Sequence, residues 1–302
     1  MQPSQASHSI GDAMLSAIIK PDGAELISLR GTKEGELLWQ AGPQWPRHSP
    51  VLFPIVGRLA ESRLRHQGHN YTMTQHGFAR DSLFDWVEQS EARAVLRLTE
   101  NAQTQAIYPF RFILELTYAI ADGALSVTTR VTNPGDVVLP CSVGAHPAFN
   151  WPLMPGVPKE RHVLEFEVLE FDAPEEASAV LLTDGLLDAR APLPLQGRVL
   201  PLSSELFARD ALILPSLASR SVRFIARDEA GRTARAIKVS WEGYRDLGIW
   251  SKPDGAPFLC IEPWFGMASP LGWDGEFTEK PGILLLAPGE SRAMSWSIKV
   301  EA

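Results

Sequence analysis

The segment SVGAHPAFNWPL, residues 142–153, places a titratable imidazole among aromatic and amide side chains. His146 precedes a proline and is followed closely by Phe149, Asn150 and Trp151. An imidazole transfers protons near neutral pH, an amide hydrogen-bonds to hydroxyl groups, and aromatic rings offer flat apolar faces. Together these groups are typical of one wall of a sugar pocket, and another part of the chain must supply the opposite wall.

A carboxyl group stands inside an apolar run nearer the C-terminus. In FLCIEPW, residues 258–264, Glu262 follows four apolar residues and precedes a proline and Trp264. Glutamate is seldom buried without a partner or a purpose, and burial raises the pKa of its carboxyl group. A solvent-facing position on an edge strand is the plain alternative, which the apolar neighbours disfavour. Glu262 and His146 therefore form a candidate base and acid that could act on opposite sides of a substrate.

Three further polar side chains interrupt apolar segments. They are Arg58 in VGRL, His76 in QHGFARD and Asp210 in FARDALIL. Each has a plain structural alternative: an exposed strand end for the arginine, a core or turn position for the histidine, and turn chemistry for the aspartate. A guanidinium can instead donate two parallel hydrogen bonds to adjacent hydroxyl groups or to a carboxylate.

Metal binding and nucleophilic catalysis find little support in the sequence. His76 and His146 stand 70 residues apart, and neither HxH nor HExxH occurs. Cys141 and Cys260 show no CxxC spacing and no adjacent base, and the chain has no GxSxG segment. We therefore expect neither a metal nor a cofactor, and we interpret both cysteines as small buried residues.

The composition argues against several classes of partner. With 302 residues, 45% hydrophobic and 21% charged, the chain suits a soluble globular protein with a sizeable core. A net charge of -8 without a basic run disfavours nucleic acid, because binding to phosphates needs clustered Lys and Arg. No apolar run approaches the roughly 20 residues that span a bilayer, and the N-terminus lacks a secretory pattern. We expect a cytoplasmic protein that binds neither nucleic acid nor membrane.

Period-two alternation of apolar and polar residues recurs along the chain and predicts half-buried antiparallel strands. The clearest examples are residues 111–118, 124–131, 236–241 and 295–300. Turn signals rich in Gly and Pro separate them without pooling into a linker. The sequence thus predicts an all-β fold, a large antiparallel β-sandwich forming a single domain over residues 1–302.

Four segments stand apart from this pattern. Short helical pieces are expected over 81–89 and 203–209, and residues 1–12 are expected to be a flexible N-terminus. The region 155–205 is rich in Pro and acidic residues and matches no motif, and we expect it to shape one rim of the site.

Taken in order, five short motifs give the chain a resemblance to the aldose 1-epimerase (galactose mutarotase-like) family. They are VGRL, QHGFARD, VGAHPAFNWP, FARDALIL and IEPWFG, within a match running from about residue 15 to the C-terminus. The resemblance implies one large antiparallel β-sandwich with an open concave face. It also implies cofactor-free interconversion of sugar anomers, in which a Glu takes the proton of the anomeric hydroxyl and a His protonates the ring oxygen.

Carried over by motif, Glu262 is the expected base and His146 the expected acid. The resemblance assigns His76, Arg58 and Asp210 to binding and orienting the sugar. Trp264, together with Phe149 and Trp151, is expected to supply apolar faces for the C–H side of a pyranose. We expect a sugar substrate and a monomer or homodimer.

The chain departs from the best-known galactose-type members of the family. Gly57-Arg58 stands where they carry Asn-Arg, and Pro147 follows the histidine. These changes resemble a less characterised bacterial branch and leave the sugar open. Arg80 and Lys252 are additional cations near the motifs, and either could meet a phosphate or an acidic sugar.

Three alternatives to a hexose epimerase follow from the same residues. A hexose-6-phosphate 1-epimerase requires the fold to gather Arg58, Arg80 and Lys252 around a phosphate. A non-catalytic sugar-binding or sensing protein would not need both an acid and a base. A glycosidase would use Asp210 and Glu262 as carboxylates roughly 5–10 Å apart, which leaves the histidines without a role.

Overall fold

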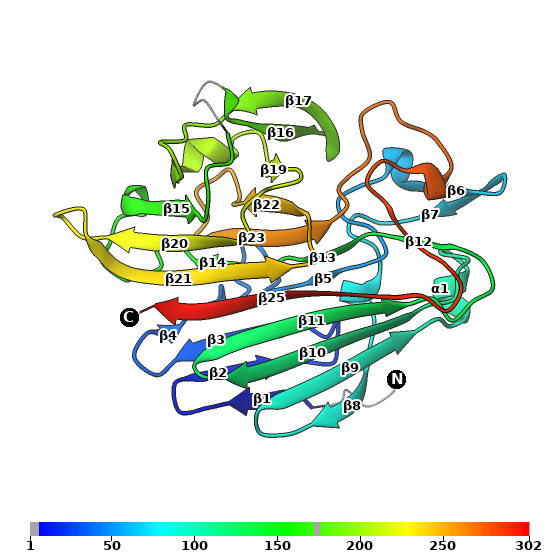
Figure 1. The fold of residues 1–302 in the computed structure, drawn as a ribbon, viewed down its shortest axis with the longest axis horizontal. Coiled ribbons are helices and arrows are strands. Elements are labelled where there is room, and N and C mark those ends of the chain that lie inside the picture. The colour runs from blue at the N-terminus through cyan, green and yellow to red at the C-terminus, as the bar shows by residue number, and fades with distance from the viewer. Residues whose placement is uncertain (1–5, 172–175, 302) are drawn as a thin grey trace.

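The computed structural model describes residues 6–171 and 176–301, and most of its regular structure is β-strand (Figure 1). Two antiparallel sheets dominate the fold. The nine-stranded sheet has the order β18-β15-β20-β21-β25-β11-β10-β9-β8. The eight-stranded sheet has the order β17-β16-β19-β22-β23-β13-β5, with β14 pairing with β23 beside this path. The predicted all-β sandwich is confirmed.

The nine-stranded sheet consists of β8 (Asp85–Gln89), β9 (Arg93–Thr99), β10 (Ile113–Ala121), β11 (Ala124–Thr132), β15 (His162–Phe166), β18 (Val199–Pro201), β20 (Ser221–Arg227), β21 (Thr233–Glu242) and β25 (Ser291–Glu301). The eight-stranded sheet consists of β5 (Val51–Leu52), β13 (Val143–Ala145), β14 (Ala148–Asn150), β16 (Ser178–Thr183), β17 (Leu186–Pro192), β19 (Leu212–Leu214), β22 (Asp246–Trp250) and β23 (Phe258–Phe265).

Smaller elements complete the fold. A four-stranded sheet contains β1 (His8–Gly11), β2 (Leu15–Ile19), β3 (Leu26–Gly31) and β4 (Gly35–Glu36), and two strand pairs are β6 (Arg63–His66) with β7 (His69–Thr72) and β12 (Leu139–Cys141) with β24 (Leu284–Leu286). The short helices are η1 (Ala60–Ser62), η2 (Ala79–Asp81), α1 (Ala102–Gln105), η3 (Lys159–Arg161), η5 (Ser204–Phe207) and η6 (Phe277–Glu279). Within the described residues, no helix is long and apolar enough to cross a membrane.

The two large sheets share one hydrophobic core. Leu114 and Leu116 of β10 belong to it, as do Leu259 and Ile261 of β23. On β10 the buried residues alternate with less buried ones over the whole strand, as the sequence pattern predicted. Period-two burial places every second side chain in the core, and the remaining face of each strand is available for water or for a site.

The expectations for the two helical pieces and for the N-terminus met different outcomes. A helix over 81–89 was the wrong prediction, because Asp85–Gln89 forms the edge strand β8, in which Trp86 packs against the core and Val87 is exposed. The helical piece over 203–209 is confirmed by η5. Of the expected flexible N-terminus, residues 1–5 lie outside the described residues, whereas His8–Gly11 forms β1 against β2.

Candidate active site

Strand β23 presents the candidate base on the face that points away from the main core. Cys260, Glu262 and Trp264 alternate with Leu259 and Ile261, and only the latter two belong to the main core cluster. Side chains two residues apart on a strand share a face. The site is therefore built on the outer face of the eight-stranded sheet.

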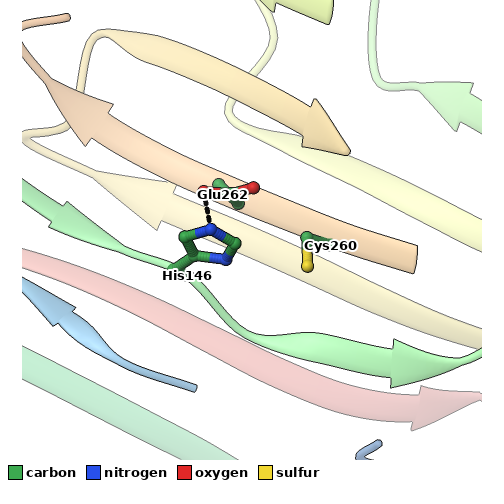
Figure 2. Close-up of side chains that lie close together, drawn as sticks. All are labelled: His146, Cys260 and Glu262. Carbon is green, nitrogen blue, oxygen red and sulfur yellow. Dashed lines mark ion pairs between the residues drawn. The ribbon is translucent and has the colours of Figure 1, made fainter. Parts of the chain in front are cut away.

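The candidate acid lies directly opposite this carboxyl group. Val143 pairs with Phe265 and Ala148 pairs with Cys260, in one antiparallel register on either side of a break between β13 and β14. That register brings His146 opposite Glu262. The two side chains meet with 3.3 Å between His146 Nε2 and Glu262 Oε2, and both are almost fully buried (Figure 2).

These two side chains line a pocket of about 310 Å³. This volume is at the lower end of the range of about 300–1,000 Å³ that is usual for small-molecule sites. The lining includes the predicted residues His76, Arg80, His146, Asp210, Glu262 and Trp264. It also includes Leu182 and Gly185 from the motif-free region 155–205, which therefore does form part of the rim.

Two tryptophans that sequence reasoning did not select surround the candidate acid. Trp45 stacks on the His146 ring with 4.9 Å between centroids, and Trp250 meets the same ring edge-on at 5.7 Å. The loop that carries Trp45 is held by Glu25, whose carboxylate accepts backbone N–H bonds from His48 and Ser49. Neither tryptophan stands in a recognisable motif, so only the fold reveals their position.

Burial changes the protonation of the pair. Burial first, and the charge of Arg80 second, lower the pKa of His146 to about 3. Burial first, and the nearby Asp210 carboxylate second, raise the pKa of Glu262 well above its ordinary value, and the Trp264 side chain acts weakly in the opposite direction. At pH values between the pKa of His146 and the pKa of Glu262, the pair therefore holds one proton, and desolvation places this proton on the carboxyl group.

His76 reaches the pocket through a turn that needs a glycine. His76 and Gly77 both have positive φ angles, +65° and +72°. A Cβ atom at Gly77 would lie 2.2 Å from the carbonyl oxygen of Phe53, so the close approach of these chains excludes other residues. The Gly57 N–H donates to His76 Nδ1 at 3.2 Å, which leaves the proton of a neutral ring on Nε2. The His76 and His146 rings are 5.5 Å apart.

The aldose 1-epimerase family profile matches residues 7–268 of this chain. The chain belongs to the aldose 1-epimerase family. It is 30% identical over 294 residues to the chromosomal protein LacX of Lactococcus lactis subsp. lactis, covering 95% of this chain and 96% of that protein. This membership supports a sugar epimerase or mutarotase, that is, an isomerase-type enzyme with a sugar substrate.

Solved structures of the same fold agree with this membership. A galactose mutarotase related enzyme from Lactobacillus acidophilus superposes with a TM-score of 0.89 at 31% identity, covering 98% of both chains. A galactose mutarotase-like protein from Lactobacillus casei superposes with a TM-score of 0.87 at 28% identity, covering 98% of this chain and 100% of that one.

Not every residue expected from the family motifs enters the pocket. Arg58 is exposed and its Nη1 donates to the carbonyl of Asp184 at 3.1 Å, in the turn between β16 and β17, so it is absent from the pocket lining. Lys252 is likewise outside the lining and pairs with Asp254 at 3.6 Å. The cation cluster of Arg58, Arg80 and Lys252 is therefore not formed.

The prediction of which aromatic residues supply apolar faces to the sugar is also only partly correct. Phe149 and Trp151 are completely buried in the main core, and neither lines the pocket. Trp264 does line it, and Gly144 and Gly248 make room for its indole. A Cβ atom at Gly248 would lie 2.4 Å from the indole, so this side chain depends on the glycine of the neighbouring strand.

One cluster near the pair has donor atoms suitable for a metal. His146, Cys260 and Glu262 each place a ligand atom within 4.8 Å of the others (Figure 2). Imidazole, thiolate and carboxylate are all zinc ligands, but a thiol must lose its proton to bind the metal. Burial raises the pKa of the Cys260 thiol well above its ordinary value, which opposes that loss. General acid-base chemistry at this site needs only the imidazole and the carboxyl group.

Proposed function

We propose that the protein is an aldose 1-epimerase that interconverts the α and β anomers of a hexose by general acid-base ring opening and closure. The observation that carries this proposal is the 3.3 Å contact between His146 and Glu262 at the wall of a small-molecule pocket. The anomeric oxygen O1 and the ring oxygen O5 of a pyranose are bonded to the same carbon, C1. A base for O1 and an acid for O5 must therefore act close to one another, and the two groups are in contact, rather than on opposite sides of the substrate as the sequence had suggested.

The proposed reaction starts with the shared proton on His146. The Glu262 carboxylate takes the proton of O1–H and the His146 imidazolium gives its proton to O5, while the C1–O5 bond breaks and C1 and O1 become a carbonyl. Rotation about the C1–C2 bond presents the other carbonyl face. Closure follows when O5 attacks C1, His146 takes back the O5 proton, and Glu262 returns its proton to O1.

Burial of the pair fits the proton balance of this cycle. Ring opening leaves Glu262 protonated and His146 neutral, which is the arrangement that desolvation favours. Ring opening of the closed sugar needs the proton on His146 and Glu262 ionised. Transfer of the proton from Glu262 to His146, whose side chains are 3.3 Å apart, supplies that state. The pair therefore contains the same single proton before and after each turnover, and no metal or cofactor is required.

The other polar and aromatic groups of the pocket would hold the sugar. Asp210, His76 and Arg80 all line the pocket; Asp210 would accept hydrogen bonds from hydroxyl groups, and His76 and Arg80 would donate them. Trp264 and Trp45 would pack against the C–H faces of the ring. The proposal includes a cytoplasmic location, which suits the two free and buried cysteines.

Polarimetry of freshly dissolved α-D-glucose and α-D-galactose tests the proposal. The wild-type protein is expected to accelerate relaxation, and Glu262→Gln and His146→Gln are each expected to lower kcat/KM by at least about 100-fold, the usual contribution of a positioned acid or base. Cys260→Ser is the matched control, because Cys260 is buried beside the pair without a role in proton transfer. Sugar binding without acceleration by the wild-type protein would support the sensing alternative instead.

A further inference from the structure

The candidate acid lacks the support that a charged imidazole usually receives. A histidine in a site commonly donates its second N–H to a carbonyl or a carboxylate, which fixes the ring and favours its protonated form. His146 Nε2 faces Glu262, but His146 Nδ1 is buried with no hydrogen-bond partner among the residues that the structure describes. Stabilisation of an imidazolium at this position must therefore come from other charges or from the groups that pack on its ring.

The charged groups around His146 do not favour its protonation. After burial, the charge of Arg80 lowers its pKa most, and Arg47 lowers it further. The Glu25 carboxylate raises this pKa, but its effect is the smallest of the three. The proposed reaction nevertheless needs the proton on His146 at the moment when the sugar ring opens. The aromatic rings around the imidazole are the remaining source of stabilisation.

The Trp45 indole covers one face of the His146 ring. The two rings are stacked, with 4.9 Å between centroids and 27° between planes. The face of an indole carries the negative part of its quadrupole, so it attracts a cation within about 6 Å of its centre more strongly than a neutral ring. This attraction is greatest where water is excluded, as it is around the buried His146 ring. The stack therefore favours the imidazolium over the imidazole.

The fold fixes the loop that carries Trp45 to β14, the strand that follows the candidate acid. The Trp39 N–H donates to the Ala148 carbonyl, and the Ala148 N–H donates to the His48 carbonyl, both at 2.9 Å. Trp39 Nε1 also donates to the Trp45 carbonyl at 2.8 Å. Phe258 packs on the Trp45 indole with 5.5 Å between centroids. The indole is thus held in place by the protein itself, before any sugar binds.

Resting on the proposed function, we propose that Trp45 is a positioning residue whose indole face stabilises the His146 imidazolium. The resting pair keeps its proton on Glu262, and ring opening needs that proton on His146. Trp45 lowers the free energy of the second state and so acts through His146. Because this proton transfer takes place with the sugar bound, the effect belongs to kcat. A role confined to packing against the sugar would act through KM instead.

Graded fluorination of Trp45 tests the electrostatic part of this role. Fluorine withdraws electron density from the indole face and leaves its shape nearly unchanged, so the attraction for a cation weakens with each fluorine. With 5-fluoro-, 5,7-difluoro- and 5,6,7-trifluorotryptophan at position 45, kcat is expected to fall stepwise by about tenfold in all, with KM nearly constant. The same series at Trp86, on the edge strand β8, is the control and should leave kcat unchanged. A constant kcat along the series at position 45 would overturn the inference.

Substitutions of Trp45 give a second test that needs only ordinary residues. Trp45→Phe keeps a smaller aromatic face and Trp45→Leu keeps an apolar side chain without one. The kcat of Trp45→Leu is expected to fall by about tenfold or more, and that of Trp45→Phe to lie between this value and the wild-type value. Far-UV circular dichroism checks that both variants are folded. Equal kcat values in the two variants would contradict a role for the aromatic face.

Titration of His146 separates this inference from the proposed function. In Glu262→Gln the neighbouring carboxyl group no longer titrates, and the imidazole nitrogen NMR signals of His146 follow its protonation. The pKa of His146 is expected to fall along the fluorinated series, because each fluorine removes stabilisation of the charged ring. A stepwise fall supports the inference even if no sugar is epimerised. A pKa that is the same with all four indoles overturns it even if the wild-type protein is an active epimerase.

Discussion

At the scale of single residues, the proposed chemistry depends on one proton shared by His146 and Glu262. Loss of that proton would leave the pair without an acid for O5, so kcat/KM should fall as pH rises through the pKa of Glu262. Burial raises this pKa most, and the Asp210 carboxylate raises it further. The alkaline limit of activity is therefore set partly by a residue outside the pair.

Asp210→Asn tests this coupling. Removal of the negative charge should lower the pKa of Glu262, so the alkaline limb of the kcat/KM profile is expected to move to lower pH. The plateau should also fall by about tenfold, because an amide is a weaker acceptor for a sugar hydroxyl than a carboxylate. Glu205→Gln is the control, since Glu205 is exposed on η5 and should leave the limb in place. A limb that stays in place or moves to higher pH in Asp210→Asn would contradict the electrostatic coupling.

The sequence allowed prediction of some site residues and not of others. Glu262 and His146 stood out because a carboxyl group and an imidazole interrupt apolar segments that also match family motifs. Trp45 and Trp250 gave no such signal, because a tryptophan in a β-rich chain is more often a core residue than a pocket wall. Arg58 kept its family motif, but its side chain lies outside the pocket, bonded to the Asp184 carbonyl. A motif thus predicts the position of the backbone more securely than the direction of a long side chain.

At the scale of elements, the predicted strands were correct where apolar and polar residues alternate over many positions, as in β10, β11, β21 and β25. Residues 81–89 were predicted wrongly because their apolar spacing also fits one face of a short helix, and pairing with β9 decided the outcome. The register of β23 against β13 and β14, which places His146 opposite Glu262, joins segments more than 100 residues apart. Such pairing depends on tertiary packing, which local sequence patterns do not contain.

The contact between β22 and β23 gives a prediction about this register. Gly248 pairs with Glu262, and a Cβ atom there would lie 2.4 Å from the six-membered ring of the Trp264 indole. Gly248→Ala is therefore expected to cost about 1–3 kcal/mol of unfolding free energy by overpacking. The same substitution in a Trp264→Phe background should cost less, because phenylalanine lacks the indole atoms that clash.

Urea denaturation of the four proteins in this double-mutant cycle gives the coupling energy. If the two positions are in direct contact, the double mutant should lose less unfolding free energy than the sum of the two single losses, by about 1 kcal/mol or more. Additive losses would show that the clash is relieved elsewhere, and the position of Trp264 in the pocket lining would then not depend on Gly248.

At the scale of the whole molecule, the two large sheets share one apolar interior. Leu116 on the nine-stranded sheet and Leu259 on the eight-stranded sheet belong to the same core cluster, which extends along the chain from Ile10 to Ile298. Separation of the sheets would expose both inner faces to water at once, and burial of apolar area is the main favourable term in folding. We propose on this basis that residues 1–302 form a single domain.

A single domain predicts one cooperative unfolding transition. Far-UV circular dichroism reports the strands, and tryptophan fluorescence reports both sheets, since Trp241 and Trp296 lie in the nine-stranded sheet and Trp250 and Trp264 in the eight-stranded one. The two signals are expected to give coincident urea midpoints. Leu259→Ala, a cavity in the shared core, should lower both midpoints together, with a loss of about 2–5 kcal/mol. Two resolved transitions, or a midpoint that shifts for one signal alone, would mean that the two sheets unfold as separate units. The stability of the site would then come from the eight-stranded sheet alone.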